Sequence, residues 1–400
     1  MSSVAGWLLP AQSTRLSDRS TLIQLNIKKE EYILDSEQLK EKFEKEFLEF
    51  KNSVQKPNIL LIGSTGVGKS SLINTCFGED LAKVGIGKPV TKHIESFSCD
   101  SKSVVLFDTQ GYEIGTEKEK KFLNEVVEYA TNFRESDNPI HIAWYCIQAG
   151  GARIVDFDIS IIKKIHQTGL PIAIVLTKAD LLNEEDTKKL RETIKNVLPQ
   201  IEIFETTIKD ELNNLQLADL CQWSVDNLPT GLKISFAAAQ RKNINLKRIE
   251  ANKIVLQHTT GAGVVGFTPI PFSDAPILIA NQAGMVARIL FIYDMGSFAS
   301  QVKDLLGSAV IGTLISESGM WIAAQFIKMI PAIGTIVGGV INGTVAATIT
   351  YAIGASVSEL CASFSEKAIS GNAAELKEFI DNMEFFFKDE VTKNFKQKQG

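Results

Sequence analysis

The chain has 400 residues, of which 44% are hydrophobic and 22% are charged, a balance typical of globular proteins. This length allows two domains, on a prior of about 150 residues per domain. The net charge of -5 argues against a protein that coats nucleic acid, because binding to phosphate backbones usually goes with a basic surplus.

The cysteines indicate a reducing environment. The chain has five of them, and no two are spaced as Cys-x-x-Cys, so the sequence supports neither a zinc site nor a disulfide framework. We therefore expect reduced thiols and a cytoplasmic location. The start of the chain lacks the basic region of a secretory signal.

The chain divides into four predicted segments. Residues 1–35 are expected to form a loose arm, and residues 36–55 an amphipathic helix with Ser36 as a possible N-cap. Residues 56–247 alternate between apolar runs and helical patterns, whereas residues 248–400 are poor in charge and read as a largely helical second domain.

The alternation in the third segment predicts an α/β fold with a mainly parallel sheet covered on both faces. The predicted strands are Asn58–Ile62, Val104–Phe107, Ile140–Ile147, Pro171–Leu176 and Leu232–Phe236. The predicted helices are residues 69–77, 117–133, 156–167, 185–197 and 209–220.

A phosphate-binding loop follows the first of these strands. The run Gly63-Ser64-Thr65-Gly66-Val67-Gly68-Lys69-Ser70 fits the pattern G-x-x-x-x-G-K-[ST], and it leads into a predicted helix together with Ser71. Glycines let backbone N–H groups wrap around phosphates at the helix N-terminus. Lys69 would bind the β- and γ-phosphates, and the Ser70 hydroxyl would bind Mg²⁺.

Further candidates for the phosphate and metal site follow in the chain. Asp108-Thr109-Gln110-Gly111 comes after the strand Val104–Phe107, so that Asp108 would hold Mg²⁺ and the Gly111 N–H would contact the γ-phosphate. Thr91 lies in a Gly- and Pro-rich loop, where it could close over Mg²⁺ as part of a nucleotide-dependent switch. An ordinary exposed loop Thr is the alternative.

The base-binding candidates are Thr177-Lys178-Ala179-Asp180, directly after the strand Pro171–Leu176. A carboxylate matches the N1–H and the exocyclic amine of guanine, a pair of donors that adenine lacks. Asp180 would therefore select guanine, while the aliphatic part of Lys178 would lie along the base. The order of the motifs along the chain therefore indicates a site for GTP and GDP and not for nucleotides in general.

These motifs resemble the translation-factor-related G domains, and most closely the Era-like GTPases. The resemblance covers about half of the chain and implies that residues 56–247 form a G domain that hydrolyses GTP with Mg²⁺. It also implies that Ala237-Ala238, after the last predicted strand, take the place of the Ser-Ala pair whose backbone contacts guanine in the family. Thr177 stands where the family most often has Asn.

The position that orients the attacking water in Ras-like enzymes holds Tyr112 instead of Gln. We therefore expect slow intrinsic hydrolysis, with Lys69, Thr91 and Gly111 as the catalytic candidates. Gly66 stands where some Era-like enzymes have a potassium-binding Asn, so potassium activation is not expected. Arg153 could act as a catalytic finger across a dimer, but a surface or ion-pair role is the stronger interpretation.

The second half resembles an all-helical module of unknown function that is fused to Era-like GTPases, on residues 259–290 with their Pro-Ile-Pro-Phe-Ser-Asp-Ala-Pro centre. The stretch 329–358 carries no Asp, Glu, Lys or Arg and is long enough to span ~30 Å of hydrocarbon. A compact helical bundle, a membrane-inserting hairpin and a GTP-controlled membrane contact remain open, and the bundle is favoured because Pro331 and paired glycines interrupt the stretch.

The sequence thus predicts a GTPase switch whose helical domain responds to the nucleotide, in a layout that resembles interferon-inducible and dynamin-related GTPases. The alternative is a nucleotide-stabilised scaffold, soluble or at a membrane, with little turnover. Expected partners are guanine nucleotide, a second copy of the chain through the G domain, and conditionally a membrane surface. Nucleic acid is not expected, because no basic KH-type Gly-x-x-Gly loop is found.

Overall fold

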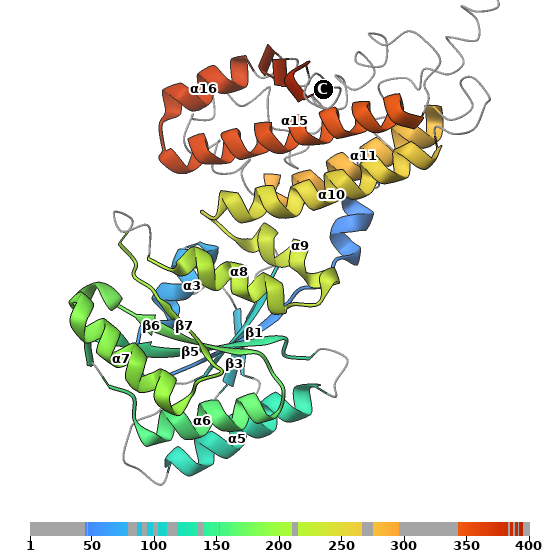
Figure 1. Cartoon of the computed structure of the whole chain (residues 1–400). Coiled ribbons are helices and arrows are strands. Elements are labelled where there is room, and N and C mark those ends of the chain that lie inside the picture. Colours follow the sequence, from blue (N-terminus) through green and yellow to red (C-terminus); the bar gives the residue numbers. More distant parts are fainter. Residues whose placement is uncertain are drawn as a thin grey trace, which may run out of the picture.

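A computed structural model describes two stacked parts, a sheet covered by helices and a layer of long helices above it (Figure 1). The described residues are 45, 47–78, 86–89, 94–98, 103–109, 118–134, 139–151, 153–209, 215–265, 275–295, 343–382, 385–386, 389–390 and 392–394.

The sheet has seven strands in the order β2-β3-β4-β1-β5-β6-β7. Strands β4, β1, β5, β6 and β7 are parallel, and β2 and β3 join them as an antiparallel edge. Parallel strands are buried on both faces, which explains why the central ones are nearly continuous runs of Ile, Leu, Val and Ala. The strands are β1 Asn58–Ile62, β2 Ile86–Pro89, β3 Ile94–Ser98, β4 Val105–Thr109, β5 Ile142–Gln148, β6 Ile172–Thr177 and β7 Glu202–Glu205.

Helices cover both faces of this sheet, and side chains that alternate along β1 point to different helices. Leu60 and Ile62 belong to the core beneath α5 Lys118–Arg134, α6 Asp156–Gln167 and α7 Glu184–Val197. Ile59 and Leu61 belong to the opposite core, beneath α3, α8 and α9 (Figure 1). These three helices span Lys69–Phe77, Leu217–Asn227 and Thr230–Ala239.

The predicted α/β class with a mainly parallel sheet is confirmed, and so are the strand Asn58–Ile62 and the helix 69–77. The predicted strand Leu232–Phe236 is wrong, because these residues lie in α9. The helix is apolar on most sides since it lies between the sheet and the helical layer, and such a short apolar run cannot be told from a buried strand by its pattern. The predicted helix 209–220 is displaced, because α8 begins only at Leu217.

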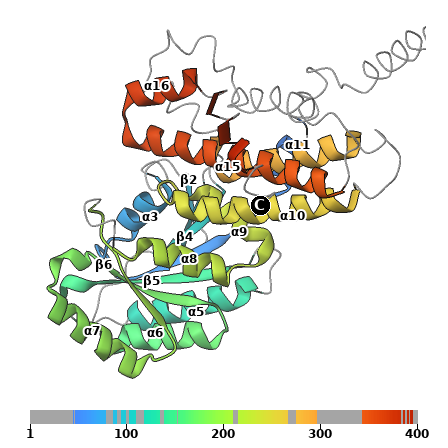
Figure 2. The same ribbon diagram turned by 45° about the horizontal axis from the view of Figure 1, so that its top comes forward.

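The upper layer consists of long helices that pack closely. In the described residues these are α10 Ile244–Val265, α11 Ala275–Ile292, α15 Gly343–Ser370 and α16 Ala373–Asp381. At Gly354 of α15, a Cβ atom would lie 2.7 Å from Met285 Sδ and 2.8 Å from Val255 Cγ2, so α10 and α11 both approach this glycine. Arg248 of α10 holds α15 through Glu359 at 3.0 Å and Glu366 at 2.8 Å. The turned view shows α10, α11 and α15 side by side (Figure 2).

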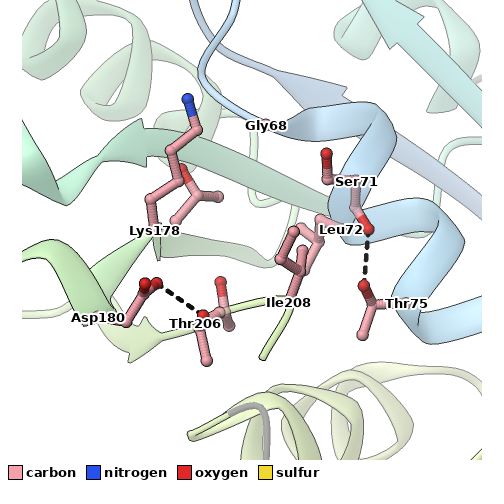
Figure 3. A pocket seen from close by; sticks show the side chains of 10 residues that line it. Gly68, Ser71, Leu72, Thr75, Lys178, Asp180, Thr206 and Ile208 are labelled. Carbon is pink, nitrogen blue, oxygen red and sulfur yellow. Dashed lines mark hydrogen bonds between the residues drawn. The ribbon is translucent and has the colours of Figure 1, made fainter. Parts of the chain in front are cut away.

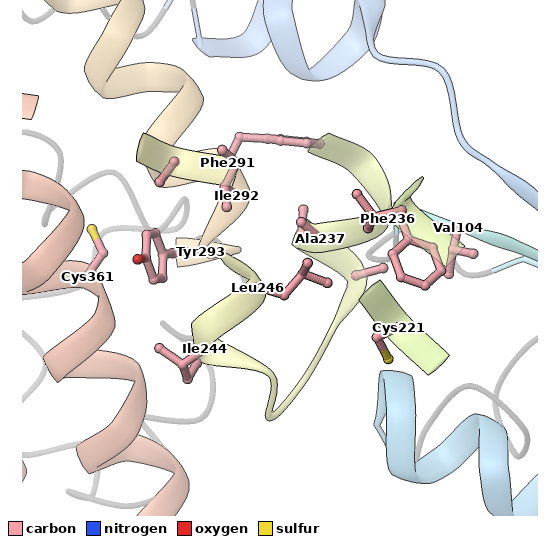
Figure 4. Close-up of a cluster of buried hydrophobic side chains, with 14 of the residues drawn as sticks. Val104, Cys221, Phe236, Ala237, Ile244, Leu246, Phe291, Ile292, Tyr293 and Cys361 are labelled. Carbon is pink, nitrogen blue, oxygen red and sulfur yellow. The ribbon is translucent and has the colours of Figure 1, made fainter. Parts of the chain in front are cut away.

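One apolar core joins the two parts of the molecule. Phe236 of α9 packs edge-on against Phe77 and Trp144, with ring centroids 6.0 Å and 6.5 Å away. The same cluster of buried side chains continues through Leu246 to Tyr293 of the turn after α11 (Figure 4). The predicted boundary at residue 247 thus falls inside a continuous core, and the division into two domains stays a prediction.

The helical residues 47–53 before the sheet pack on α11. The Phe50 ring lies edge-on to Phe291 at 5.4 Å, and the Arg288 guanidinium lies 5.2 Å from the Phe50 centroid. The predicted arm, residues 1–35, and the predicted N-cap Ser36 lie outside the described residues.

In the described residues, no helix has the length and the apolar character needed to cross a bilayer. Of the charge-free stretch 329–358, residues 343–358 belong to α15. Residues 329–342, which include Pro331 and the paired glycines Gly338 and Gly339, lie outside the described residues.

Replacing Phe236 with Ala should lower the free energy of unfolding by about 3–5 kcal/mol, because it leaves a cavity where the sheet, α3 and the helical layer meet. Phe385→Ala is the matched control, since that ring is 69% exposed and its loss should change stability by no more than about 0.5 kcal/mol. Denaturant unfolding followed by circular dichroism measures both. Equal effects of the two substitutions would contradict the shared core.

Candidate functional site

The phosphate-binding loop lies between β1 and α3, and its backbone conformation requires glycines. Gly63 has φ 151°, and a Cβ atom there would overlap the carbonyl oxygen of Cys146 in β5. Gly68 has φ 105° and caps α3. Because glycine has no side chain to accept the first N–H groups of the helix, these groups stay available to an anion.

Lys69 folds back into this loop. Its Nζ donates to the carbonyl oxygen of Gly63 at 2.9 Å and lies 3.9 Å from Asp108 Oδ1. The Lys69 side chain is only 8% exposed. A buried ammonium group beside the start of a helix suits a phosphate, because the anion would gain both charge and hydrogen bonds there.

Asp108 lies close to the loop because β4 pairs with β1 in parallel, with Asp108 opposite Leu61. Ser70 is exposed at the start of α3. A hydroxyl and a carboxylate are oxygen ligands of the kind that Mg²⁺ prefers, so this pair fits the predicted metal. Thr91 and Gly111, the other predicted ligand and phosphate contact, lie outside the described residues, as do Gln110 and Tyr112.

The base motif is tied to the phosphate loop by hydrogen bonds. The Thr177 hydroxyl donates to the carbonyl oxygen of Val67, and Lys178 Nζ donates to that of Gly66 at 2.9 Å. Lys178 has φ 53°, a left-handed conformation that turns the chain sharply after β6. The loop between β1 and α3 and the end of β6 therefore form one unit.

A pocket opens between these two motifs (Figure 3). It contains five predicted site residues, namely Gly68, Ser71, Thr177, Lys178 and Asp180. Its other lining residues are Leu72, Thr75, Thr206, Thr207 and Ile208.

The Asp180 carboxylate at this pocket has a partner on each oxygen. The Thr207 hydroxyl donates to Oδ1 at 2.6 Å, and Lys209 Nζ lies 2.9 Å from Oδ2. The hydrogen bond from Thr207, and then the one from Lys209, lower the pKa of Asp180 below its usual value. Asp180 is therefore held as a charged acceptor of hydrogen bonds.

The interpretation of Ala237-Ala238 as the loop after the last strand is wrong. Both residues lie in α9 and are buried in the core below the helical layer. The last strand is β7, and the residues after it, Thr206 to Ile208, line the pocket. The apolar pair Ile203-Phe204 before two threonines was a usable signal for this short strand, but the charged residues Glu202 and Glu205 at its ends weakened the pattern.

Two aromatic residues of β5 lie in the core beside the site. The Trp144 Nε1–H donates to Ser224 Oγ at 3.1 Å, and the Tyr145 hydroxyl donates to Asp158 at 2.8 Å. Arg153 is exposed beyond the short helix Ala149–Gly151, which agrees with a surface role.

Two family models match this chain. One, described as 50S ribosome-binding GTPase, matches residues 58–178, and the other, a domain of unknown function called DUF697, matches residues 235–383. A probable GTP-binding protein EngB from Mycoplasma genitalium is 30% identical over 142 residues, which are 36% of this chain and 72% of that protein.

The chain belongs to the Era-like P-loop GTPases. A second probable EngB, from Aquifex aeolicus, is 28% identical over 157 residues, covering 38% of this chain and 83% of that protein. Septin-9 from Mus musculus is 26% identical over 223 residues, covering 47% of this chain and 37% of that protein. This GTPase therefore combines a half that matches the GTPase model with a helical half that matches the domain of unknown function DUF697.

A solved structure of Era in complex with MgGDPNP and nucleotides 1506–1542 of 16S ribosomal RNA is 20% identical to this GTPase. The matched region covers 50% of this chain and 67% of the Era chain, with a TM-score of 0.33. The RNA in that structure is a partner of that Era protein.

Gly63→Ala should destabilise the GTPase and abolish nucleotide binding, because the added Cβ atom meets the backbone of β5. The matched control is Gly66→Ala in the same loop, where φ is 77° but nothing lies within 4 Å of the added atom. The control should cost only backbone strain, on the order of 1 kcal/mol, and Gly63→Ala about 1–3 kcal/mol more. Thermal unfolding and nucleotide titration check both. Equal losses would refute the role of the contact with Cys146.

Proposed function

We propose that this GTPase binds GTP with Mg²⁺, hydrolyses it slowly to GDP and phosphate, and acts as a switch for its helical half. The observation that carries the proposal is the pocket in which the Asp180 carboxylate lies beside a phosphate loop bonded to Thr177 and Lys178. Membership in a GTP-binding family supports the same substrate.

Guanine selection follows from the charge on Asp180. Its carboxylate accepts hydrogen bonds only, and guanine offers N1–H and an amine on the same edge. Adenine offers an acceptor at the N1 position, so its binding would leave the carboxylate poorly paired and would cost free energy. Ile208 and the stem of Lys178 line the same pocket and would contact the faces of the base.

The roles at the phosphate end are assigned by charge and position. Lys69 would exchange its bond to the Gly63 carbonyl for the β- and γ-phosphates, and the first N–H groups of α3 would bind the β-phosphate. Ser70, Asp108 and Thr91 would hold Mg²⁺, which supplies positive charge to the phosphates when bound. Gly111 would contact the γ-phosphate through its N–H group.

Slow hydrolysis is proposed because Tyr112 occupies the position that carries the water-orienting Gln in Ras-like enzymes. A tyrosine ring cannot offer the paired donor and acceptor of an amide. The backbone near Gly111, Thr91 or a partner would then position the water.

The path from nucleotide to helical half runs through α3. This helix begins at Lys69 and ends at Phe77, whose ring stacks on Trp144 at 6.0 Å and meets Phe236 of α9. The Arg241 N–H, in the turn between α9 and α10, donates to the Cys76 carbonyl at 2.9 Å. A shift of α3 on nucleotide exchange would therefore press on the start of α10.

The alternative is a scaffold that binds guanine nucleotide for stability and barely hydrolyses it. Under either function we propose a cytoplasmic protein that forms a dimer through its G domain, with a membrane surface as a conditional partner of the helical half. Analytical ultracentrifugation and liposome flotation, each with GDP and with a GTP analogue, test the dimer and the membrane contact separately.

Asp180→Asn should weaken GTP binding by roughly 100-fold or more, because an amide presents a donor to one of the two guanine donors. The same variant should gain affinity for XTP, since xanthine has a carbonyl oxygen in place of the exocyclic amine. Calorimetric titration of GTP, XTP and ATP into wild type and variant measures the exchange of preference. Unchanged GTP affinity in the variant would remove Asp180 from the base site.

Multiple-turnover phosphate release distinguishes switch from scaffold. We expect a wild-type rate of about 10⁻⁴ to 10⁻² s⁻¹, the range of GTPases that act without an added partner. Lys69→Met should abolish this release, whereas Lys163→Met, an exposed lysine of α6, should leave it unchanged. Less than one phosphate released per wild-type protein over many hours would favour the scaffold.

A further inference from the structure

One imidazole lies where the helical residues 47–53, α10 and α11 meet (Figure 1). His258 of α10 lies between two side chains of α11, with Nδ1 2.8 Å from Asn281 Oδ1 and Nε2 2.5 Å from Arg288 Nη1. The Arg288 guanidinium in turn lies 5.2 Å from the centroid of the Phe50 ring. The contact between residues 47–53 and α11 therefore depends on a group that His258 holds in place.

The partners of His258 define its protonation state. A guanidinium group only donates hydrogen bonds, so Nε2 of His258 is the acceptor and carries no proton. The Asn281 amide donates from Nδ2 to the His258 carbonyl oxygen at 3.0 Å, which turns its own oxygen toward Nδ1. Nδ1–H then donates to this oxygen. This pair of bonds exists only in the neutral imidazole with its proton on Nδ1.

A second proton on His258 would break the arrangement. Nε2–H would point at the Arg288 guanidinium, so that a contact between two cations would replace a hydrogen bond. Both side chains are half-buried, where such repulsion is screened less than in water. Burial lowers the pKa of His258 most, the Arg288 charge lowers it further, and the hydrogen bond to Asn281 partly offsets these effects.

In the described residues, the charge that acts on the pKa of His258 is that of Arg288. α11 contains no other charged residue, and residues 343–358 of α15 contain none, with Tyr351 as their titratable group. The nearest charged groups along α10 are Glu250 and Lys253, which are bonded to each other at 2.6 Å, and residues 47–53 bring Glu49 and Lys51. Arg288 thus decides the sign of the effect of protonation.

We propose that His258 and Arg288 form an acid-sensitive latch, which holds residues 47–53 on the helical half and releases them when the imidazole is protonated. This segment leads into β1, so the latch lies on a connection between sheet and helical half that is separate from the path through α3. The Ser235 hydroxyl of α9 donates to the Gln55 carbonyl at 2.6 Å. The residues next to β1 therefore stay attached, and the release is confined to 47–53.

The direction of the pH effect follows from the lowered pKa of His258. Once Arg288 has moved away with the release of residues 47–53, this pKa lies nearer to the ordinary value of about 6.5. The released state therefore takes up a proton at a higher pH than the latched state, and release is favoured as the pH falls below that value. Above it, the imidazole is neutral in both states and the latch stays closed.

Hydrogen–deuterium exchange of the amides of residues 47–53 measures the latch. Protection factors at about pH 7.5 and about pH 5.5 correct for the intrinsic effect of pH on exchange. In wild type, protection should fall by about two- to tenfold at the lower pH, the range for the loss of one cation–π contact. His258→Gln keeps a neutral acceptor and should retain its protection. His166→Gln, which changes a histidine of α6 bonded to Gln200, is the matched control and should behave as wild type.

Two further variants test the mechanism. Asn281→Asp places a carboxylate on Nδ1 and raises the pKa of His258 in both states, because α10 and α11 stay packed together. Release should then begin at a higher pH than in wild type. Arg288→Met removes the cation that contacts Phe50, so protection should be low at both pH values and should no longer depend on pH.

Equal protection of residues 47–53 in wild type at both pH values would overturn the latch. An equal loss of protection in wild type and His258→Gln would also overturn it, because another group would then be responsible. If the Gln variant does not fold, Asn281→Asp decides, since a release that begins at the same or a lower pH than in wild type contradicts the role of His258. The measurement uses the full chain without nucleotide, so its outcome does not depend on the proposed substrate.

Discussion

The hydrogen bonds from Thr177 and Lys178 to the phosphate loop are the constraint on which the site depends. β6 does not pair with β1, because β5 lies between them in the sheet. The Thr177 hydroxyl crosses this gap to the Val67 carbonyl, and Lys178 Nζ reaches that of Gly66. Without these bonds, the groups that would hold the base and those that would hold the phosphates could move independently. With them, one nucleotide can meet both sets in a fixed relation, which reduces the entropy lost on binding.

The helical half is also joined to the sheet by direct contacts. α9 contributes Phe236 to the core of the sheet and continues, within a few residues, into α10. Lys247 of α10 is 1% exposed and donates from Nζ to the Ala238 carbonyl at 3.2 Å, so a buried hydrogen bond joins these two helices. Leaving a buried polar group without a partner is costly, so this contact favours one arrangement of α9 and α10. Under the proposed switch, a displacement of α3 would pass to α10 through this junction.

Much of this architecture could be predicted because its signals are local. The run Asn58 to Phe77 contains a buried strand, the glycines of the loop and an amphipathic helix, and each signal agrees with the next. The errors have a common cause in tertiary context. α9 looked like a strand because both of its sides are covered, and β7 went unseen because it lies at the sheet edge with Glu at each end. Because the last strand was predicted in the wrong place, the base loop was also predicted in the wrong place, at Ala237 and Ala238.

The segment after β7 differs in its chemistry from Ala237 and Ala238. A loop of two alanines could contribute only backbone groups to the base, whereas the segment after β7 brings a hydroxyl and an ammonium group to Asp180. β7 pairs with β6 over Leu176↔Glu205, so the residues that follow the two strands leave the same edge of the sheet side by side. The Thr206 N–H donates to the Leu176 carbonyl at 2.8 Å and extends this pairing beyond the strand ends. Under the proposed function, guanine recognition would depend on two adjacent strand ends, and the Thr177 to Asp180 motif alone does not reveal the second of them.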